Sequence, residues 1–209
     1  KRAAVCTIGD GATSKGDFYE SLNAAGAWQL PVVFFITNNQ WAISVPRNSQ
    51  SAAQTLAQKG IAAGAHCLQV DGNDVIAVHH AMNEALARAY ADSGPTVIEA
   101  VTYRLADHTT ADDASRYRPP EEVADAWKRE PILRLRNYLN EIGAWKKANE
   151  ENLLKQCNEQ VQAAAQAYLD TPPPPLEQMF DHLHATLPSA FLAQRAAMLG
   201  TGHGRDHAR

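Results

Sequence analysis

An aspartate between two glycines and a later pair of asparagines are the residues of this sequence best suited to hold a metal ion. Gly9-Asp10-Gly11 follows a short apolar run, and Asn38-Asn39 directly follows another, Val32–Thr37. Mg²⁺ takes about six oxygen ligands and is commonly shared between a carboxylate and phosphate groups. A carboxylate placed where a helix N-terminus would attract phosphate therefore indicates a diphosphate held through a divalent cation. We expect Asp10 and Asn39 to ligate that cation.

Short apolar segments alternate with helical patterns through the first two-thirds of the chain, and this alternation predicts the sheet that positions these residues. Strands are expected at Ala3–Ile8, Val32–Ile36, Cys67–Val70 and Thr96–Val101. Helices are expected after an N-cap at Ser14, over Thr55–Gly64, and after an N-cap at Asn73, the last with one face formed by Val75, Val78, Met82, Leu86 and Tyr90. The pattern predicts an α/β fold with a doubly wound parallel sheet, in which the carboxyl ends of consecutive strands meet at one edge.

After Arg104 the sequence becomes polar and loses its regular hydrophobic pattern. The polar stretch Leu105–Pro120 lacks periodicity, and loops of this length inside compact domains are usually functional or disordered. Helices are expected over Glu121–Tyr138 and Glu150–Tyr168. The expected division is an α/β core at 1–120, a helical part packed on it at 121–171, a proline spacer and amphipathic segment at 172–199, and a disordered tail at 200–209. Because the chain opens directly in a strand, we expect the first part of the core domain to lie upstream.

Composition excludes several classes of protein. The 209 residues carry 19 Lys and Arg against 23 Asp and Glu, a net charge of −4, with no basic patch interleaved with aromatics. We therefore expect no nucleic-acid partner. No apolar run approaches the roughly 20 residues of a membrane span, so no membrane partner is expected. The 3 cysteines are far apart and form no CxxC pair, which favours a reducing compartment over a disulfide framework.

Two common phosphate-binding motifs do not fit the glycines. A Walker loop ends in Gly-Lys-Ser/Thr, but Gly16 is followed by Asp17. A dinucleotide fingerprint needs a third glycine where this chain has Ser14. The interpretation that remains is a diphosphate bridged by a metal.

The GDG and NN motifs together are typical of thiamine-diphosphate enzymes. The stretch GDGATSKGDFYESLNAAGAWQLPVVFFITNNQWAIS resembles the alpha subunit of the decarboxylase component of 2-oxo acid dehydrogenase complexes. The resemblance continues through QKGIAAGAHCLQVDGNDVIAV and TYRLADHTTADDASRYRPPEEV and so covers most of the chain. Within that family, the sequence most resembles the alpha subunit of bacterial pyruvate dehydrogenase. The resemblance implies the thiamine-diphosphate-binding fold with a C-terminal helical extension.

The resemblance assigns the cofactor site around the two motifs. It implies thiamine diphosphate and Mg²⁺ as cofactors, with Asp10 and Asn39 as side-chain ligands of the metal. Trp41 stands where the family usually has tyrosine, and it would ligate through its backbone carbonyl. Gly9, Gly11 and Ala12 would line the cofactor, the last two through backbone amides to the diphosphate. Some relatives carry arginine just before the NN pair, where this chain has Thr37, so that contact is expected to be absent.

The resemblance also assigns roles in the polar loop. His108 would contact the cofactor and assist transfer to the lipoyl group, and it is the one catalytic residue expected in this chain. Arg104 would contact the cofactor and help to order the loop, together with Asp112, Asp113, Arg116 and Tyr117.

The implied activity is oxidative decarboxylation of a 2-oxo acid, pyruvate by preference, with transfer of the acyl group to a lipoyl domain of the partner acyltransferase. The expected assembly has two alpha and two beta subunits, and the beta subunit supplies the glutamate that activates the cofactor. The expected location is the cytoplasm of a bacterium, or the mitochondrial matrix if the source is eukaryotic. Branched-chain 2-oxo acid or acetoin dehydrogenase alpha subunits are alternatives. A non-catalytic assembly module, inactive without its beta subunit, is the alternative from another class.

Overall fold

The computed structural model describes residues 1–201, and the chain divides into two compact units, Lys1–Lys146 and Lys147–Arg209. This division falls inside the helical part expected at 121–171. The expected domain boundaries stay predictions. Residues 202–209, most of the expected disordered tail, lie outside the described residues. Gly200 and Thr201 belong to a helix, so the expected start of that tail is too early.

The first unit is built on four parallel strands: β1 (Ala4–Gly9), β2 (Val32–Asn38), β5 (His66–Asp71) and β6 (Thr96–Val101). Their order in the sheet is β1-β2-β6-β5. Each lies within two residues of its expected position, and β6 has the expected bounds. β6 lies between two strands and has elements packed on both faces of the sheet, and most of its residues are buried.

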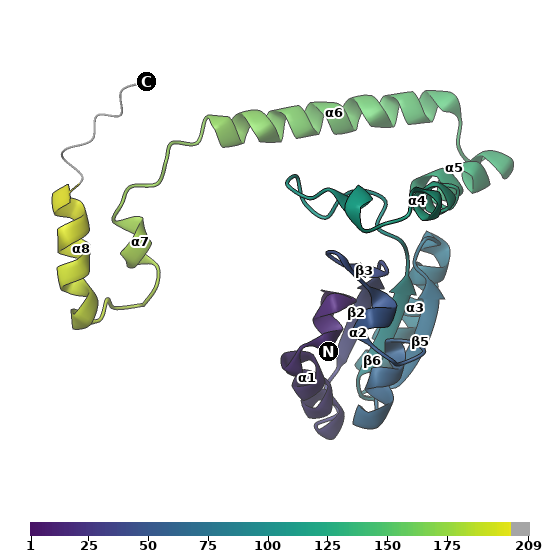
Figure 1. Cartoon of the computed structure of the whole chain (residues 1–209), viewed down its shortest axis with the longest axis horizontal. Helices are drawn as coiled ribbons and strands as arrows, with labels where there is room; N and C mark the ends of the chain where they lie inside the picture. Colours follow the sequence, from purple (N-terminus) through teal and green to yellow (C-terminus); the bar gives the residue numbers. More distant parts are fainter. Residues whose placement is uncertain (202–209) are drawn as a thin grey trace. The chain divides into compact units, whose positions relative to one another are not determined.

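Helices cover both faces of this sheet (Figure 1). Helix α1 (Gly16–Ala27) and the 3₁₀ helix η2 (Ala57–Ala63) pack on one face, where Phe18, Leu22 and Ala25 of α1 are buried. Helix α3 (Val75–Tyr90) packs on the other. The crossovers β1–α1–β2 and β5–α3–β6 run across the sheet in opposite directions, so right-handed connections place their helices on opposite faces. The expected doubly wound α/β fold is confirmed.

Three details of these helices differ from expectation. Ser14 ends the 3₁₀ turn η1 (Gly11–Ser14), and the N-cap of α1 is Lys15. The N-cap of α3 is Asp74 rather than Asn73, and its carboxylate accepts from the amides of Ile76 and Ala77. The buried face of α3 is a row of small residues, Ala81, Ala85 and Ala89, which lets the helix approach the sheet closely. Of the larger residues expected on this face, Met82 and Leu86 are half-buried, and Val75 and Tyr90 are exposed.

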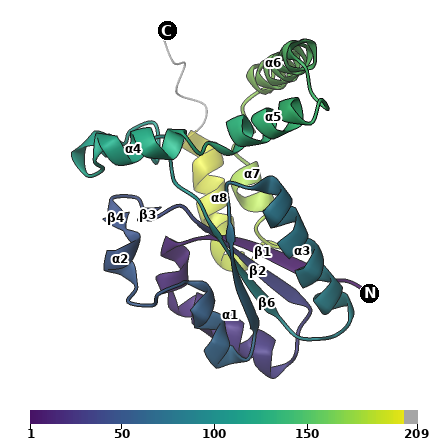
Figure 2. The same ribbon diagram turned by 90° about the vertical axis from the view of Figure 1, so that its right-hand side faces the viewer.

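A short hairpin follows β2 and is absent from the sequence-based expectation. It consists of β3 (Trp41–Ala42) and β4 (Val45–Pro46), and the short helix α2 (Arg47–Gln50) comes next (Figure 2). Gln40 and Ile43 have positive φ angles of 71° and 55°. An isoleucine in this region is rare because its branched side chain crowds the backbone, so the turn has no sequence signal that identifies it.

The remaining elements of the described residues are helices and turns. The loop after β6 contains the 3₁₀ turn η3 (Ala114–Arg116), and α4 (Pro120–Trp127) and α5 (Pro131–Glu141) replace the single helix expected there. The break comes before Pro131, which cannot donate inside a helix, and Glu130 caps the helix that follows. The second unit contains α6 (Lys147–Leu169), α7 (Gln178–Asp181) and α8 (Ser189–Thr201). None of the helices in the described part combines the length and apolarity that a bilayer crossing needs.

Candidate functional site

Asp10 lies at the carboxyl end of β1, beside the end of β2. The parallel register pairs Gly9 with Thr37, so the next residues along the two strands are Asp10 and Asn38. The Asp10 side chain is only 3% exposed, and its Oδ2 accepts a hydrogen bond from Nε2 of Gln50 at 3.2 Å. The buried carboxylate is bonded to a neutral amide, which leaves acceptor capacity for a cation.

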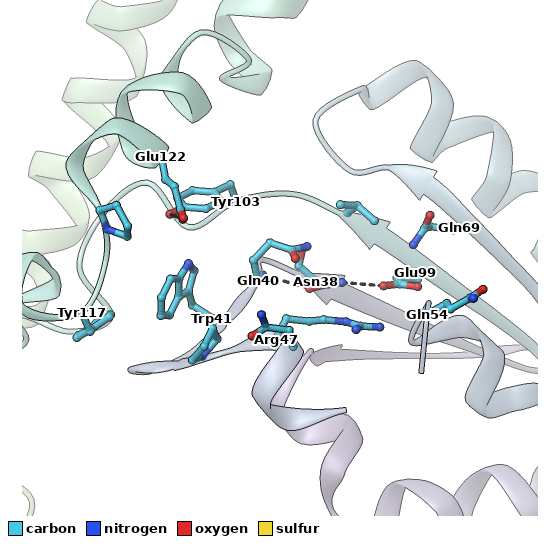
Figure 3. Close-up of a pocket in the computed structure, with 14 residues that line it drawn as sticks. Asn38, Gln40, Trp41, Arg47, Gln54, Gln69, Glu99, Tyr103, Tyr117 and Glu122 are labelled. Carbon is cyan, nitrogen blue, oxygen red and sulfur yellow. Dashed lines mark hydrogen bonds between the residues drawn. The ribbon is translucent and has the colours of Figure 1, made fainter. Parts of the chain in front are cut away.

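The two asparagines that follow β2 have different surroundings. Asn38 is buried, and its Nδ2 donates to Oε1 of Glu99 at 2.7 Å (Figure 3). Asn39 is half-buried, and its Oδ1 accepts from the amide of Trp41 at 3.1 Å. The strand pairing therefore brings Asp10 to the same sheet edge as the asparagine pair. The shared coordination of one ion by Asp10 and Asn39 stays a prediction.

Gly11 lies against the hairpin that follows β2. A Cβ atom added at Gly11 would come within 2.7 Å of the Cβ of Ala42 and 3.4 Å of Oε1 of Gln50. The absence of a side chain at this position therefore allows the turn after β1 to touch the hairpin. Gly11 and Ala12 open η1, and the first amides of a helical turn have no acceptor inside that turn.

Arg104 fastens the hairpin to the polar loop. Its guanidinium donates to the carbonyl of Ile43 at 2.7 Å, to the carbonyl of Trp41 at 3.3 Å and to the hydroxyl of Tyr117 at 2.8 Å. The Trp41 carbonyl is the one expected to ligate the metal, and a guanidinium already occupies one of its acceptor positions. A cation bound there would lie beside a second positive charge, so this ligand role stays a prediction.

The polar loop is held by a chain of hydrogen bonds that begins at Arg104. The hydroxyl of Tyr117 donates to Oδ2 of Asp112 at 2.5 Å, and the same oxygen accepts from the amide of His108 at 2.8 Å. The hydrogen bond from Tyr117, that from His108 and the positive charge of Arg104 lower the pKa of Asp112. Burial and the Asp112 carboxylate raise the pKa of Tyr117. Three of the residues expected to order the loop are thus in contact.

His108 is exposed on this loop, and its ring faces Arg104. The guanidinium lies 3.5 Å from Nδ1, and since a guanidinium has only N–H donors, Nδ1 acts as the acceptor. In the neutral ring the proton then lies on Nε2. Asp113 has a local role, because it caps η3 through the amide of Ser115 at 3.2 Å and lies 3.7 Å from the guanidinium of Arg116.

A cavity of about 730 Å³ lies between the end of β2, the hairpin, β6 and the start of α4. Most of the residues that line it have polar side chains, and the carboxylate of Glu99 and the amide groups of Gln54 and Gln69 lie toward one end (Figure 3). Trp41 and Tyr103 lie toward the other end, where the hydroxyl of Tyr103 donates to Glu122 at 3.1 Å. Burial, together with Glu122, raises the pKa of Tyr103, against the opposing effect of a hydrogen bond with Trp41.

Sequence reasoning missed three polar side chains beside the site: Gln50, Lys59 and Glu99. Only Glu99 has a signal in the sequence, as the one charge within the apolar run TVIEAV. The described residues contain no group of three or more histidine, cysteine or acidic side chains placed to hold a metal. The candidate site has a different donor set, with one carboxylate and neutral oxygens, which suits a Mg²⁺ that completes its shell with phosphate and water.

Comparison with known proteins relates the chain to one family. The family model described as "Dehydrogenase E1 component" matches residues 1–177. The 3-methyl-2-oxobutanoate dehydrogenase subunit alpha of Mycobacterium tuberculosis is 46% identical over 192 residues. The pyruvate dehydrogenase E1 component subunits alpha of Staphylococcus epidermidis and Staphylococcus aureus are 42% and 41% identical over 192 residues. Each match covers 91% of this chain and 52% of the relative, so the chain spans about half the length of these curated relatives.

Proposed function

The chain belongs to the dehydrogenase E1 component family, and on that premise we propose that it is part of the alpha subunit of a thiamine-diphosphate-dependent 2-oxo acid dehydrogenase. The observation that carries this proposal is the buried carboxylate of Asp10 beside the Asn38-Asn39 pair, at adjacent carboxyl ends of parallel strands. Ligands of open α/β sheets bind at such edges. A buried carboxylate that has no cationic hydrogen-bond partner within residues 1–201 suits a metal-bridged diphosphate.

The described residues fit the diphosphate end of such a cofactor. Asp10 and Asn39 would hold Mg²⁺, Gly11 and Ala12 would offer backbone amides, and Gly9 would leave room beside them, since nothing lies within 4 Å of a Cβ built there. When bound, thiamine diphosphate supplies the carbanion equivalent that such decarboxylations need. This chain contributes positioning and charge compensation.

The loop that carries His108 would serve the acyl-transfer step. Arg104 and Asp112 hold the two sides of this loop through Tyr117, which leaves the His108 ring exposed. An exposed ring on an ordered loop suits a group that must meet both a cofactor and an arriving lipoyl domain. The activating glutamate would come from a beta subunit, so this chain alone is expected to have no decarboxylase activity. The bacterial cytoplasm is the proposed location.

Pyruvate is the proposed substrate, with acetyl transfer to lipoyl as the outcome. A branched-chain 2-oxo acid is the second candidate, because the Mycobacterium tuberculosis relative, at 46% identity, is named for 3-methyl-2-oxobutanoate. Turnover of pyruvate and of 3-methyl-2-oxobutanoate by the full-length protein with its beta subunit distinguishes the two. A higher kcat/KM for the branched acid would overturn the assignment of pyruvate.

Calorimetric titration of thiamine diphosphate with Mg²⁺ into the full-length protein with its beta subunit tests the cofactor site. Asp10→Ala is expected to abolish binding while assembly is retained. Asp17→Ala is the matched control, because this aspartate is exposed in the first turn of α1 and is expected to have no effect on binding. Wild-type affinity in the Asp10 variant would refute the proposed cofactor site.

A further inference from the structure

The 3₁₀ helix η2 (Ala57–Ala63) packs on the same face of the sheet as α1. It has polar connections to both strand ends that form the candidate site. One connection runs through Glu99 to Asn38, after which Asn39 follows. The other runs from Lys59 to Thr13, in the turn that begins at Asp10.

The first connection is formed by a buried carboxylate. Glu99 is 1% exposed in the central strand β6, where its Oε1 accepts from Nδ2 of Asn38 at 2.7 Å and its Oε2 accepts from the amide of Ala57 at 3.1 Å. Asn38 in turn accepts from the amide of Gln40 at 3.1 Å through Oδ1. Each atom of the Asn38 amide therefore has a defined partner, which fixes the side chain and the backbone around Asn39.

The second connection is formed by an ammonium group. Nζ of Lys59 donates to the carbonyl of Thr13 at 2.8 Å and lies 3.0 Å from its Oγ1. Thr13 is fully buried, and its hydroxyl donates to the carbonyl of Asp10 at 2.7 Å. The Lys59 ammonium also lies 5.3 Å from the centre of the Tyr19 ring in α1. The turn at Asp10 is thus fixed from η2.

We propose that η2 is a brace for the metal-binding edge, in which Glu99 acts through Asn38 and Lys59 acts through Thr13 as positioning residues for Asn39 and Asp10. The inference rests on the proposed function for its link to a metal, but the brace itself is a property of this chain. Residues that orient metal ligands through hydrogen bonds commonly change metal affinity by about 10- to 100-fold when replaced.

Glu99→Gln tests the first connection without a change of shape. Two amide groups then face each other, and wherever they rotate, one N–H donor from Asn38, Ala57 or Gln40 loses its acceptor. The double variant Asn38→Asp with Glu99→Gln restores every pair: the new carboxylate accepts from the glutamine amide and from Gln40, and the glutamine carbonyl accepts from Ala57. The double variant also has the wild-type net charge.

The full-length protein with its beta subunit is studied by two measurements. Hydrogen exchange without ligands is expected to rise in residues 38–42 for Glu99→Gln and to return toward wild type in the double variant. The Mg²⁺ affinity, titrated with thiamine diphosphate present at a temperature where all variants are folded, is expected to fall about tenfold or more in the single variant and to recover in the double. A double variant as impaired as the single one, or a single variant identical to wild type, would overturn the role of Glu99.

Lys59→Met tests the second connection. Exchange in residues 10–14 is expected to rise and Mg²⁺ affinity to fall about tenfold, while Lys59→Arg retains most of both. Lys15→Met is the matched control, since Lys15 is exposed just after the same turn. Equal effects of the two methionine variants would overturn the role of Lys59. If wild type itself binds no cofactor, the proposed function fails, and the exchange measurements still decide whether η2 is a brace.

Discussion

Replacement of Gly26 by alanine sets two opposing effects against each other in α1. Alanine is preferred over glycine inside a helix by about 1 kcal/mol. A Cβ atom at this position, however, would lie 1.8 Å from the carbonyl oxygen of Ala63 and 2.9 Å from its carbon. Overpacking commonly costs about 1–3 kcal/mol. A backbone carbonyl cannot rotate aside as a side chain can, which places the cost at the upper end of that range, and after subtraction of the helix preference we expect a net loss of stability of about 2 kcal/mol. Because Ala63 ends η2, the substitution weakens the packing of α1 against the helix proposed as a brace.

Chemical denaturation of the full-length protein measures this loss as a lower midpoint at an unchanged slope. Gly16→Ala is the control in the same helix, because the nearest atom to its added Cβ is Oε1 of Glu20 at 3.8 Å, an ordinary contact. It is expected to be neutral or to stabilise by up to about 1 kcal/mol. If Gly26→Ala stabilised the protein as much as Gly16→Ala, the close approach of α1 to η2 would be refuted.

Three further predictions concern the polar loop and the core. Tyr117→Phe removes the hydroxyl that joins Arg104 to Asp112, so protease cleavage within residues 105–117 is expected to accelerate, and an unchanged rate would contradict this connection. The pKa of Asp112 is lowered in the folded protein, so its contribution to loop order is fully present above the ordinary carboxyl value of 3.8 and is lost as pH falls through the lower folded value. Hydrogen exchange in the loop, corrected for intrinsic rates, is therefore expected to rise only below about pH 4. A rise near pH 6 would refute the role of the Asp112 carboxylate. Ile98→Ala, at a fully buried position in β6, is expected to lower the free energy of unfolding by about 3 kcal/mol, and a loss below about 1 kcal/mol would contradict its packing.

The sheet could be predicted from the sequence because local pattern and tertiary environment agree there. The run Val32–Ile36 is apolar on both faces and does lie between two strands, β1 and β6. The stripe Phe18, Leu22 and Ala25 has helical spacing and is buried. In α3 the same reasoning selected the larger apolar residues, whereas close packing on the sheet buries the alanines. Periodicity identifies a face only where the larger side chains are the ones that reach the core.

The sequence motifs predicted the residues at the centre of the candidate site, but not the contacts that support them. Asp10 and Asn38-Asn39 follow recognisable strands, so their meeting at one edge follows from parallel pairing. The hairpin after β2 has no turn residue suited to its positive φ angle at Ile43. The contacts of Glu99 and Lys59 join residues distant in sequence, and only the packed fold brings them together.

The grip of Arg104 on both the hairpin and the polar loop couples two parts of the molecule that a ligand would otherwise address separately. Anything that draws the Trp41 carbonyl toward itself competes with the guanidinium, and the guanidinium is also the anchor of Tyr117. Were a ligand at the hairpin to displace the guanidinium from this carbonyl, its binding and the order of the loop would be coupled by equal amounts of free energy in either direction. A substitution of Arg104 is therefore expected to loosen the hairpin and the polar loop together, since one side chain contacts both.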